Sequence, residues 1–153
     1  MKSEIIYRNE SSWFGRWGED EGHEIVISAD FSNPANWPYT AKRREFEDGE
    51  DTECKVYKLS KALYEKVKAT IAANKELAGC EEHVENGGRD LSDDSYFFAC
   101  DSFSKQIYGA SIYSVGSHEA EGPAKDRTAN YYVYKTVKEI TEVLNAGGVD
   151  IWS

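Results

Sequence analysis

The stretch "KVYKLSKALYEKVKATI" (residues 55–71) contains the point at which the chain changes its hydrophobic period. After Ser60, the apolar residues Leu63, Val67 and Ile71 recur at intervals of four, the spacing of one helix face. Before it, "AKRREFEDGEDTECKVYKLS" (41–60) is typical of two strands joined at an acidic turn, with Asp48-Gly49 as the bend. We therefore expect a hairpin followed by a helix over residues 60–78, with Ser60 as its N-cap.

The segments before this hairpin also favour β-structure. Residues 3–8 ("SEIIYR") and 23–31 ("HEIVISADF") are rich in β-branched side chains and predict a first hairpin. Its tip is expected to be "SSWFGRWGEDEG" (11–22), because Gly15, Gly18 and Gly22 break a helix and no alternation is long enough for a strand. Pro34 and Pro38 fix the turn that follows.

The segments after the helix repeat the sequence of strands and then a helix. Residues 95–101 and 105–115 have strand composition, long loops are expected at 80–94 and 116–130, and residues 130–145 predict a second helix closed by Gly147-Gly148. The tail "VDIWS" (149–153) either docks as an edge strand or lays Trp152 on the core. Strands that do not alternate regularly with helices indicate one α+β domain over residues 1–153, an antiparallel sheet of about six strands with two helices packed on one face. The expected helix core is Leu63, Val67, Ile71, Val137, Ile140 and Leu144.

The charge of the chain restricts its partners. The formal net charge is −10, and nearly all of it lies in the first two thirds of the sequence. A field of this sign repels phosphate backbones and anionic lipid and attracts basic protein surfaces. We expect no direct binding to nucleic acid or membrane, although the acidity could also serve solubility alone. No apolar leader opens the chain, so we expect a cytoplasmic protein, whose oligomeric state the sequence leaves open.

Residues that could carry chemistry are present without a motif that orders them. Cys80-x-x-His83 offers two zinc-competent ligands, whereas a zinc site needs four, and three cysteines do not indicate a disulfide framework. Side chains of the types used in nucleophilic catalysis are present at Cys100, His23, His83 and His118, but no local signature joins them. We therefore expect no metal and no cofactor; the sequence favours a protein without enzymatic activity but leaves an enzyme open as the alternative.

Acidic clusters beside aromatic residues are the remaining signal. Such a surface can compete with nucleic acid for a basic groove, because carboxylates replace phosphates and rings act as anchors. Trp13 is expected to pack on the sheet and Trp17 to stay exposed. The sequence thus predicts a small acidic inhibitor, of the immunity or anti-defence type, that engages a basic nucleic-acid-binding protein. The expected partner-binding residues are Trp17, Glu19, Asp20, Glu21, Glu45, Glu47, Asp48, Glu50 and Asp51.

A second hypothesis is a small-ligand-binding domain or enzyme. Its pocket would be lined by tyrosine and tryptophan side chains, around Trp37, Tyr39 and His118. The two hypotheses require different surfaces. A binding protein needs an exposed acidic face and no deep cavity, whereas a ligand site needs a concave, mostly apolar pocket with a few convergent polar groups.

Overall fold

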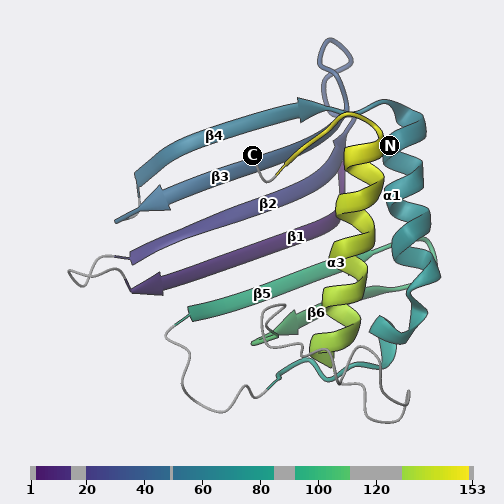
Figure 1. The fold of residues 1–153 in the computed structure, drawn as a ribbon. Coiled ribbons are helices and arrows are strands. Elements are labelled where there is room, and N and C mark those ends of the chain that lie inside the picture. The colour runs from purple at the N-terminus through teal and green to yellow at the C-terminus, as the bar shows by residue number, and fades with distance from the viewer. Residues whose placement is uncertain (1–2, 15–19, 49, 85–91, 111–128, 152–153) are drawn as a thin grey trace.

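The structure is a computed structural model that describes residues 3–14, 20–48, 50–84, 92–110 and 129–151. It confirms the expected α+β fold: six antiparallel strands form one sheet in the order β4-β3-β2-β1-β5-β6, and helices α1 and α3 lie across one face of it (Figure 1). In the described residues, no helix is long and apolar enough to cross a membrane. The elements are β1 (Ser3–Phe14), β2 (Asp20–Asp30), β3 (Tyr39–Glu47), β4 (Glu50–Lys58), α1 (Lys61–Ala73), the 3-10 helix η1 (Lys75–Gly79), β5 (Ser92–Ala99), β6 (Ser104–Tyr108) and α3 (Ala129–Ala146).

The junction between hairpin and helix forms as the sequence predicts. Asp48 takes a left-handed backbone conformation (φ 52°), which tight two-residue turns need and aspartate tolerates, and β4 starts two residues later at Glu50. The Ser60 hydroxyl accepts a hydrogen bond from the Leu63 amide at 3.1 Å and so caps α1. The α-helix ends at Ala73 instead of reaching residue 78, and η1 continues the chain as a tighter turn.

The core lies between the helices and the sheet. All six residues expected in the helix core are buried, in the same hydrophobic cluster as Ile25 and Ile27 of β2. Aromatic rings fill much of the remaining space: Tyr7 packs against Phe98 with ring centroids 5.4 Å apart, and Tyr39 packs against Tyr64 at 4.9 Å.

The expectation of an irregular tip over residues 11–22 is wrong for most of that stretch. β1 continues to Phe14 and β2 begins at Asp20, because this part of β1 pairs with both β2 and β5. Gly22 lies inside β2, opposite Ser12 on β1 and Phe46 on β3. A Cβ atom on Gly22 would overlap both the Ser11 carbonyl oxygen and the Phe46 ring. This glycine therefore allows a close approach within the sheet and does not end the strand.

Two further expectations near the C-terminus change in detail. The described part of the tail, residues 149–151, is not a strand; Val149 and Ile151 are buried on the core, and Trp152 lies outside the described residues. The strand expected over 105–115 ends at Tyr108, followed by Gly109 at a positive φ of 83°, and residues 111–128 lie outside the description. In the loop expected over 80–94, His83 forms a parallel bridge to Tyr108, and β5 already begins at Ser92.

Candidate protein-binding surface

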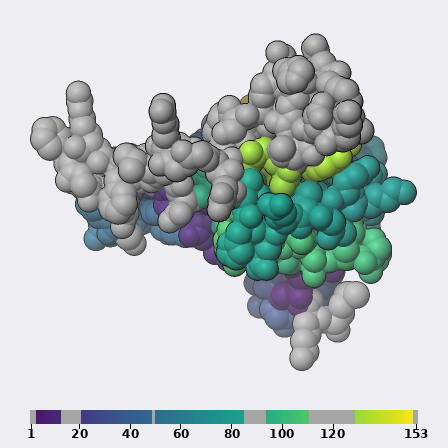
Figure 2. Space-filling model, turned by 90° about the horizontal axis from the view of Figure 1, so that it is seen from below, coloured from purple at the N-terminus to yellow at the C-terminus, as the bar shows by residue number. Residues whose placement is uncertain are grey.

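One end of the sheet extends beyond the helices. Figure 1 shows α1 and α3 crossing one end of the strands, while the opposite ends of β2, β3 and β4 continue past them. In Figure 2 the blue atoms of the β3 and β4 region again lie on the side of the molecule away from the teal atoms of α1. We call the carboxylates on these strand ends the acidic sheet end. Its members are Glu21, Glu45, Glu47, Asp48, Glu50 and Glu53.

The strand register brings these acids together in rows. Glu21, Glu47 and Glu50 lie opposite one another on β2, β3 and β4. The next row holds Glu45 and Glu53, with His23 on β2. Side chains alternate along a strand, and Glu21 is an even number of residues from buried Ile25, so both rows are on the helix-bearing face of the sheet. Each row crosses strands at the usual spacing of about 4.8 Å.

Basic residues neutralise only part of this surface. Arg43 pairs with Glu45, and Lys55 pairs with Glu53 at 3.2 Å. The exposed carboxylates of Glu47, Asp48 and Glu50 form no ion pair with any described residue. Like charges directly opposite in a sheet are destabilising. The row therefore has an electrostatic cost that a basic partner would relieve.

Asp51 is separated from the other predicted residues by an irregularity in β4. Glu45 lies opposite Glu53, but Phe46 lies opposite Asp51, so Thr52 is an extra residue that bulges. Asp51 consequently lies on the face without helices, where its Oδ1 accepts a hydrogen bond from Arg44 at 2.7 Å. This hydrogen bond is the largest of the effects that raise the pKa of Arg44.

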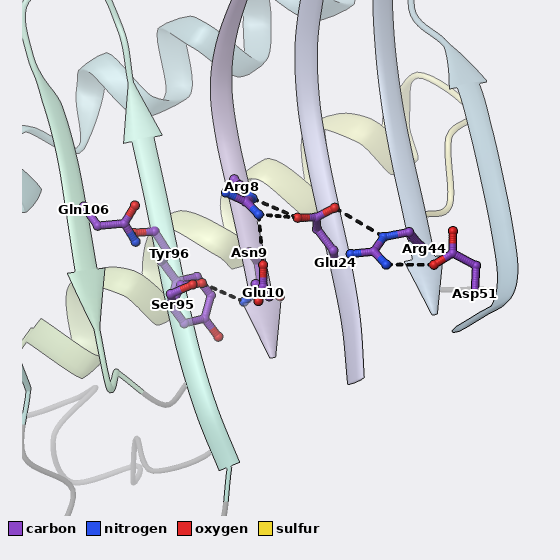
Figure 3. A network of polar contacts seen from close by, with 9 residues as sticks. All are labelled: Arg8, Asn9, Glu10, Glu24, Arg44, Asp51, Ser95, Tyr96 and Gln106. Atoms are coloured by element: carbon purple, nitrogen blue, oxygen red, sulfur yellow. Dashed lines mark hydrogen bonds and ion pairs between the residues drawn. The ribbon is translucent and has the colours of Figure 1, made fainter. Parts of the chain in front are cut away.

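Arg44 connects Asp51 to a charge network that crosses four strands (Figure 3). The Arg44 guanidinium also lies 3.5 Å from Glu24, and Glu24 accepts two hydrogen bonds from Arg8, at 2.6 and 2.9 Å. Arg8 in turn binds Glu10 at 2.9 Å. Charges of both signs alternate here, so the face without helices is locally balanced and the acidic sheet end is not.

Of the remaining predicted contacts, the structure describes only the backbone of Asp20. Asp20 is the first residue of β2 and pairs with Phe14 through the backbone. Trp17 and Glu19 lie outside the described residues, as does the side chain of Trp13, so the expected division of roles between the two tryptophans stays a prediction.

A buried polar cluster that the sequence did not single out lies beside the acidic rows. Asn9 is 2% exposed; its amide donates to the Ser95 carbonyl (3.2 Å) and to the Ser11 hydroxyl (3.4 Å), and its oxygen lies 3.1 Å from His23 Nε2. Both N–H groups of the Asn9 amide donate elsewhere, and its oxygen can only accept a hydrogen bond. His23 Nε2 must therefore carry the proton that it donates to this oxygen. Burial lowers the pKa of His23, as does Arg43, while Asp94 and Glu45 act in the opposite direction.

Of the residues expected to line an aromatic pocket, Tyr39 packs against the core and Trp37 is 51% exposed. The Trp37 indole N–H donates to the Leu59 carbonyl at 2.8 Å, and Tyr39 packs edge-on against Phe31 and against Tyr64. His118 lies outside the described residues. A cavity under α3, beside Tyr7, has a volume of about 10 Å³, room for a single water molecule. Neither Trp37 nor Tyr39 lines this cavity.

Cys80 and His83, the two residues that could begin a metal site, make other contacts. Cys80 Sγ donates to the Glu76 carbonyl at 3.4 Å, and the His83 ring stacks on Tyr108 with centroids 5.2 Å apart. Within the described part of the chain, no three His, Cys, Asp or Glu side chains group to hold an ion. Cys54, Cys80 and Cys100 are free thiols.

Comparison with known proteins adds no assignment. The chain matches no protein-family model and no curated protein.

Proposed function

We propose that this protein binds a basic protein surface through the acidic sheet end, as a cytoplasmic inhibitor or immunity-type partner of a nucleic-acid-binding protein. The observation that carries the proposal is the row formed by Glu21, Glu47 and Glu50, continued at the turn by Asp48. Three of these carboxylates, those of Glu47, Asp48 and Glu50, have no ion pair among the described residues.

The geometry suits competition with a phosphate backbone. The row presents negative charges at regular strand spacing on a paired sheet, so little backbone conformational entropy is lost when a partner binds them. A groove that holds nucleic acid offers lysine and arginine side chains, which can pair with carboxylates. Aromatic anchoring by Trp17, with Glu19 and Asp20 beside it, would extend the contact along the β1–β2 connection.

The ligand-binding alternative receives less support from the same geometry. Tyr39 fills space between Phe31 and Tyr64, and Trp37 is hydrogen-bonded to the main chain. The larger hollows along α1 are open grooves. One lies against Cys100 and Ser102, and the other runs between α1 and α3 over alanine side chains.

The test compares two triple variants of equal charge change. Glu47→Gln, Asp48→Asn and Glu50→Gln remove the unpaired carboxylates, and the control removes the exposed helix carboxylates of Glu65, Glu76 and Glu142 in the same way. Each protein is immobilised and exposed to a panel of purified nucleases and other DNA-binding enzymes, with and without competing duplex DNA.

We expect the wild type and the control triple to retain at least one enzyme of the panel, with retention lost when DNA or salt is added. The acidic-end triple should lose retention, since exposed charges act within about 8–10 Å at physiological ionic strength. Equal retention by both triple variants would place the binding surface elsewhere. Retention that DNA does not reduce would contradict competition for a nucleic-acid groove.

A further inference from the structure

Strand β4 leaves one edge of the sheet open. Among the described residues it pairs only with β3, and most of its side chains are exposed, including Cys54 and Val56. The Leu59 amide donates to the Tyr39 carbonyl of the neighbouring strand. Since backbone groups alternate in direction along a strand, Tyr57 and Lys55 also face β3, whereas the N–H and C=O groups of Cys54, Val56 and Lys58 face outward.

The opposite edge of the sheet is partly covered. The Tyr108 amide at the end of β6 donates to the Glu82 carbonyl, and the Val84 amide donates to the Tyr108 carbonyl. The segment that follows η1 thus pairs with the end of β6, and nothing comparable covers β4 among the described residues. An open edge is a template for pairing with another chain, and it is usually blocked by charges of one sign or by proline.

The charges of β4 are arranged differently, because their sign changes at the middle of the strand. In "EDTECKVYK" (50–58), Glu50, Asp51 and Glu53 precede Cys54, and Lys55 and Lys58 follow it. We propose that two copies of the protein pair β4 against β4 in antiparallel orientation, about a two-fold axis at Cys54, so that the two six-stranded sheets become one continuous sheet. The partner is a second copy because β4 is complementary to its own reversed sequence, with acidic residues before Cys54 and lysines after it.

The register follows from the hydrogen bonds and the charges together. With Cys54 at the axis, Glu53 lies opposite Lys55 of the second copy on the same face of the sheet, and the contact occurs twice by symmetry. The outward groups of Cys54 form the central hydrogen-bonded pair, and Thr52 lies opposite Val56 of the second copy. An axis at Val56 would place Lys55 opposite Tyr57 and lose both charge pairs.

The interface is small, because the bulge at Thr52 shortens the regular part of the edge. It buries much less than the roughly 1,200 Å² of a standard stable complex, so the dimer is weak and forms at high protein concentration. The contact does not use Glu47 or Asp48, which lie at the β3–β4 turn. In an antiparallel pair, the β3–β4 turns of the two copies lie at opposite ends of the interface. The inference therefore stands independently of the proposed function.

Thiol crosslinking tests the register. In a Cys80→Ser/Cys100→Ser background, the two Cys54 thiols lie on the axis, with Cα atoms about 5.5 Å apart in a hydrogen-bonded pair, within the range of a disulfide. Copper phenanthroline should therefore convert this protein to a covalent dimer. The matched control adds Cys54→Ser and Val56→Cys, which separates the thiols by about 14 Å across the axis. Adding Thr52→Cys to this control should restore the crosslink.

Equal rates of crosslinking at Cys54 and in the Val56→Cys control would overturn the register. A charge exchange between Glu53 and Lys55 provides the second test, and sedimentation velocity measures the dimerisation. Lys55→Glu should weaken dimerisation about tenfold, and Glu53→Lys/Lys55→Glu should recover it, since the exchanged charges again lie opposite each other. A wild-type protein that stays monomeric at millimolar concentration, or a double variant without recovery, would overturn the proposal. The double variant Glu47→Gln/Asp48→Asn, which leaves β4 unchanged, should dimerise like the wild type.

Discussion

Replacing Asn74 with alanine should destabilise the fold by removing the link between the end of α1 and α3. Asn74 is 2% exposed and lies between α1 and η1. Its amide donates to the Thr70 carbonyl at 2.8 Å and to Glu139 Oε1 at 2.9 Å, and its oxygen accepts from Lys135 Nζ at 2.7 Å. One side chain thus ends α1 and connects it to a charged pair on α3.

The size of the effect follows from these three bonds. The bond to the Thr70 carbonyl contributes about 1 kcal/mol net, and bonds to buried charges reach about 1.5–3 kcal/mol each. Glu139 and Lys135 are more than a third exposed and lie 3.1 Å apart, so they stay paired and regain water when Asn74 is removed. Solvent screening therefore reduces each charged bond to below about 1 kcal/mol. We expect Asn74→Ala to lower the free energy of unfolding by about 2–3 kcal/mol.

Urea denaturation followed by far-UV circular dichroism measures this loss, and the m-value should stay unchanged. A double-mutant cycle with Glu139→Ala isolates one of the bonds, with an expected coupling energy of about 0.5–1 kcal/mol. As a control, Glu142→Ala on the exposed side of α3 should show no coupling to Asn74. A loss below about 0.5 kcal/mol, within the range of ordinary surface substitutions, would show that this polar link does not hold the two helices together.

Three other substitutions test the core, the sheet and the polar cluster. Val67→Asp should unfold the protein, because it puts an unpaired charge at a fully buried site, and circular dichroism of the purified variant would show retained structure if this is wrong. Gly22→Ala should lower the free energy of unfolding by about 1–3 kcal/mol through overpacking. Adding Phe46→Ala should not restore stability, because the Ser11 carbonyl oxygen still overlaps the new methyl group. Recovery of stability in urea denaturation would contradict this. The pKa of His23 is lower in the folded state than in the unfolded state, so its contribution to stability is present above about pH 6.5 and is lost as the pH falls. His23→Gln should therefore flatten the decrease in the free energy of unfolding between about pH 7.5 and 5.5. An unchanged slope would exclude His23 as the source of this decrease.

The parts of the fold that local sequence determines could be predicted. The four-residue spacing of Leu63, Val67 and Ile71 places one helix face in the core, and Asp48-Gly49 marks a two-residue turn. The extension of β1 to Phe14 could not be predicted in the same way. That part of β1 is stabilised by pairing with β5, which begins at Ser92, and no local pattern reports a partner so distant in the chain.

The candidate site shows the same division between local and distant effects. Glu47 and Glu50 lie opposite each other because a two-residue turn joins them, so their pairing follows from the sequence once the turn is assigned. The position of Asp51 does not follow, because a single bulged residue, Thr52, moves it to the other face and to Arg44. The alignment of Glu21 with Glu47 depends on the register between β2 and β3, which forms across an intervening turn with two prolines.

The central position of β1 has a consequence for how the chain folds during synthesis. Strands β1 to β4 are joined by consecutive antiparallel connections, so these four of the six strands can pair through local contacts as the chain leaves the ribosome. Until Ser92–Ala99 follows, the side of β1 that will bind β5 is a bare edge in the nascent chain. Arg8 and Glu10 lie on that strand, and charged side chains on a transient edge discourage pairing with other nascent chains. Arg8 and Glu10, which lie on a central strand of the folded sheet, thus discourage aggregation at the exposed edge of β1 before β5 is made.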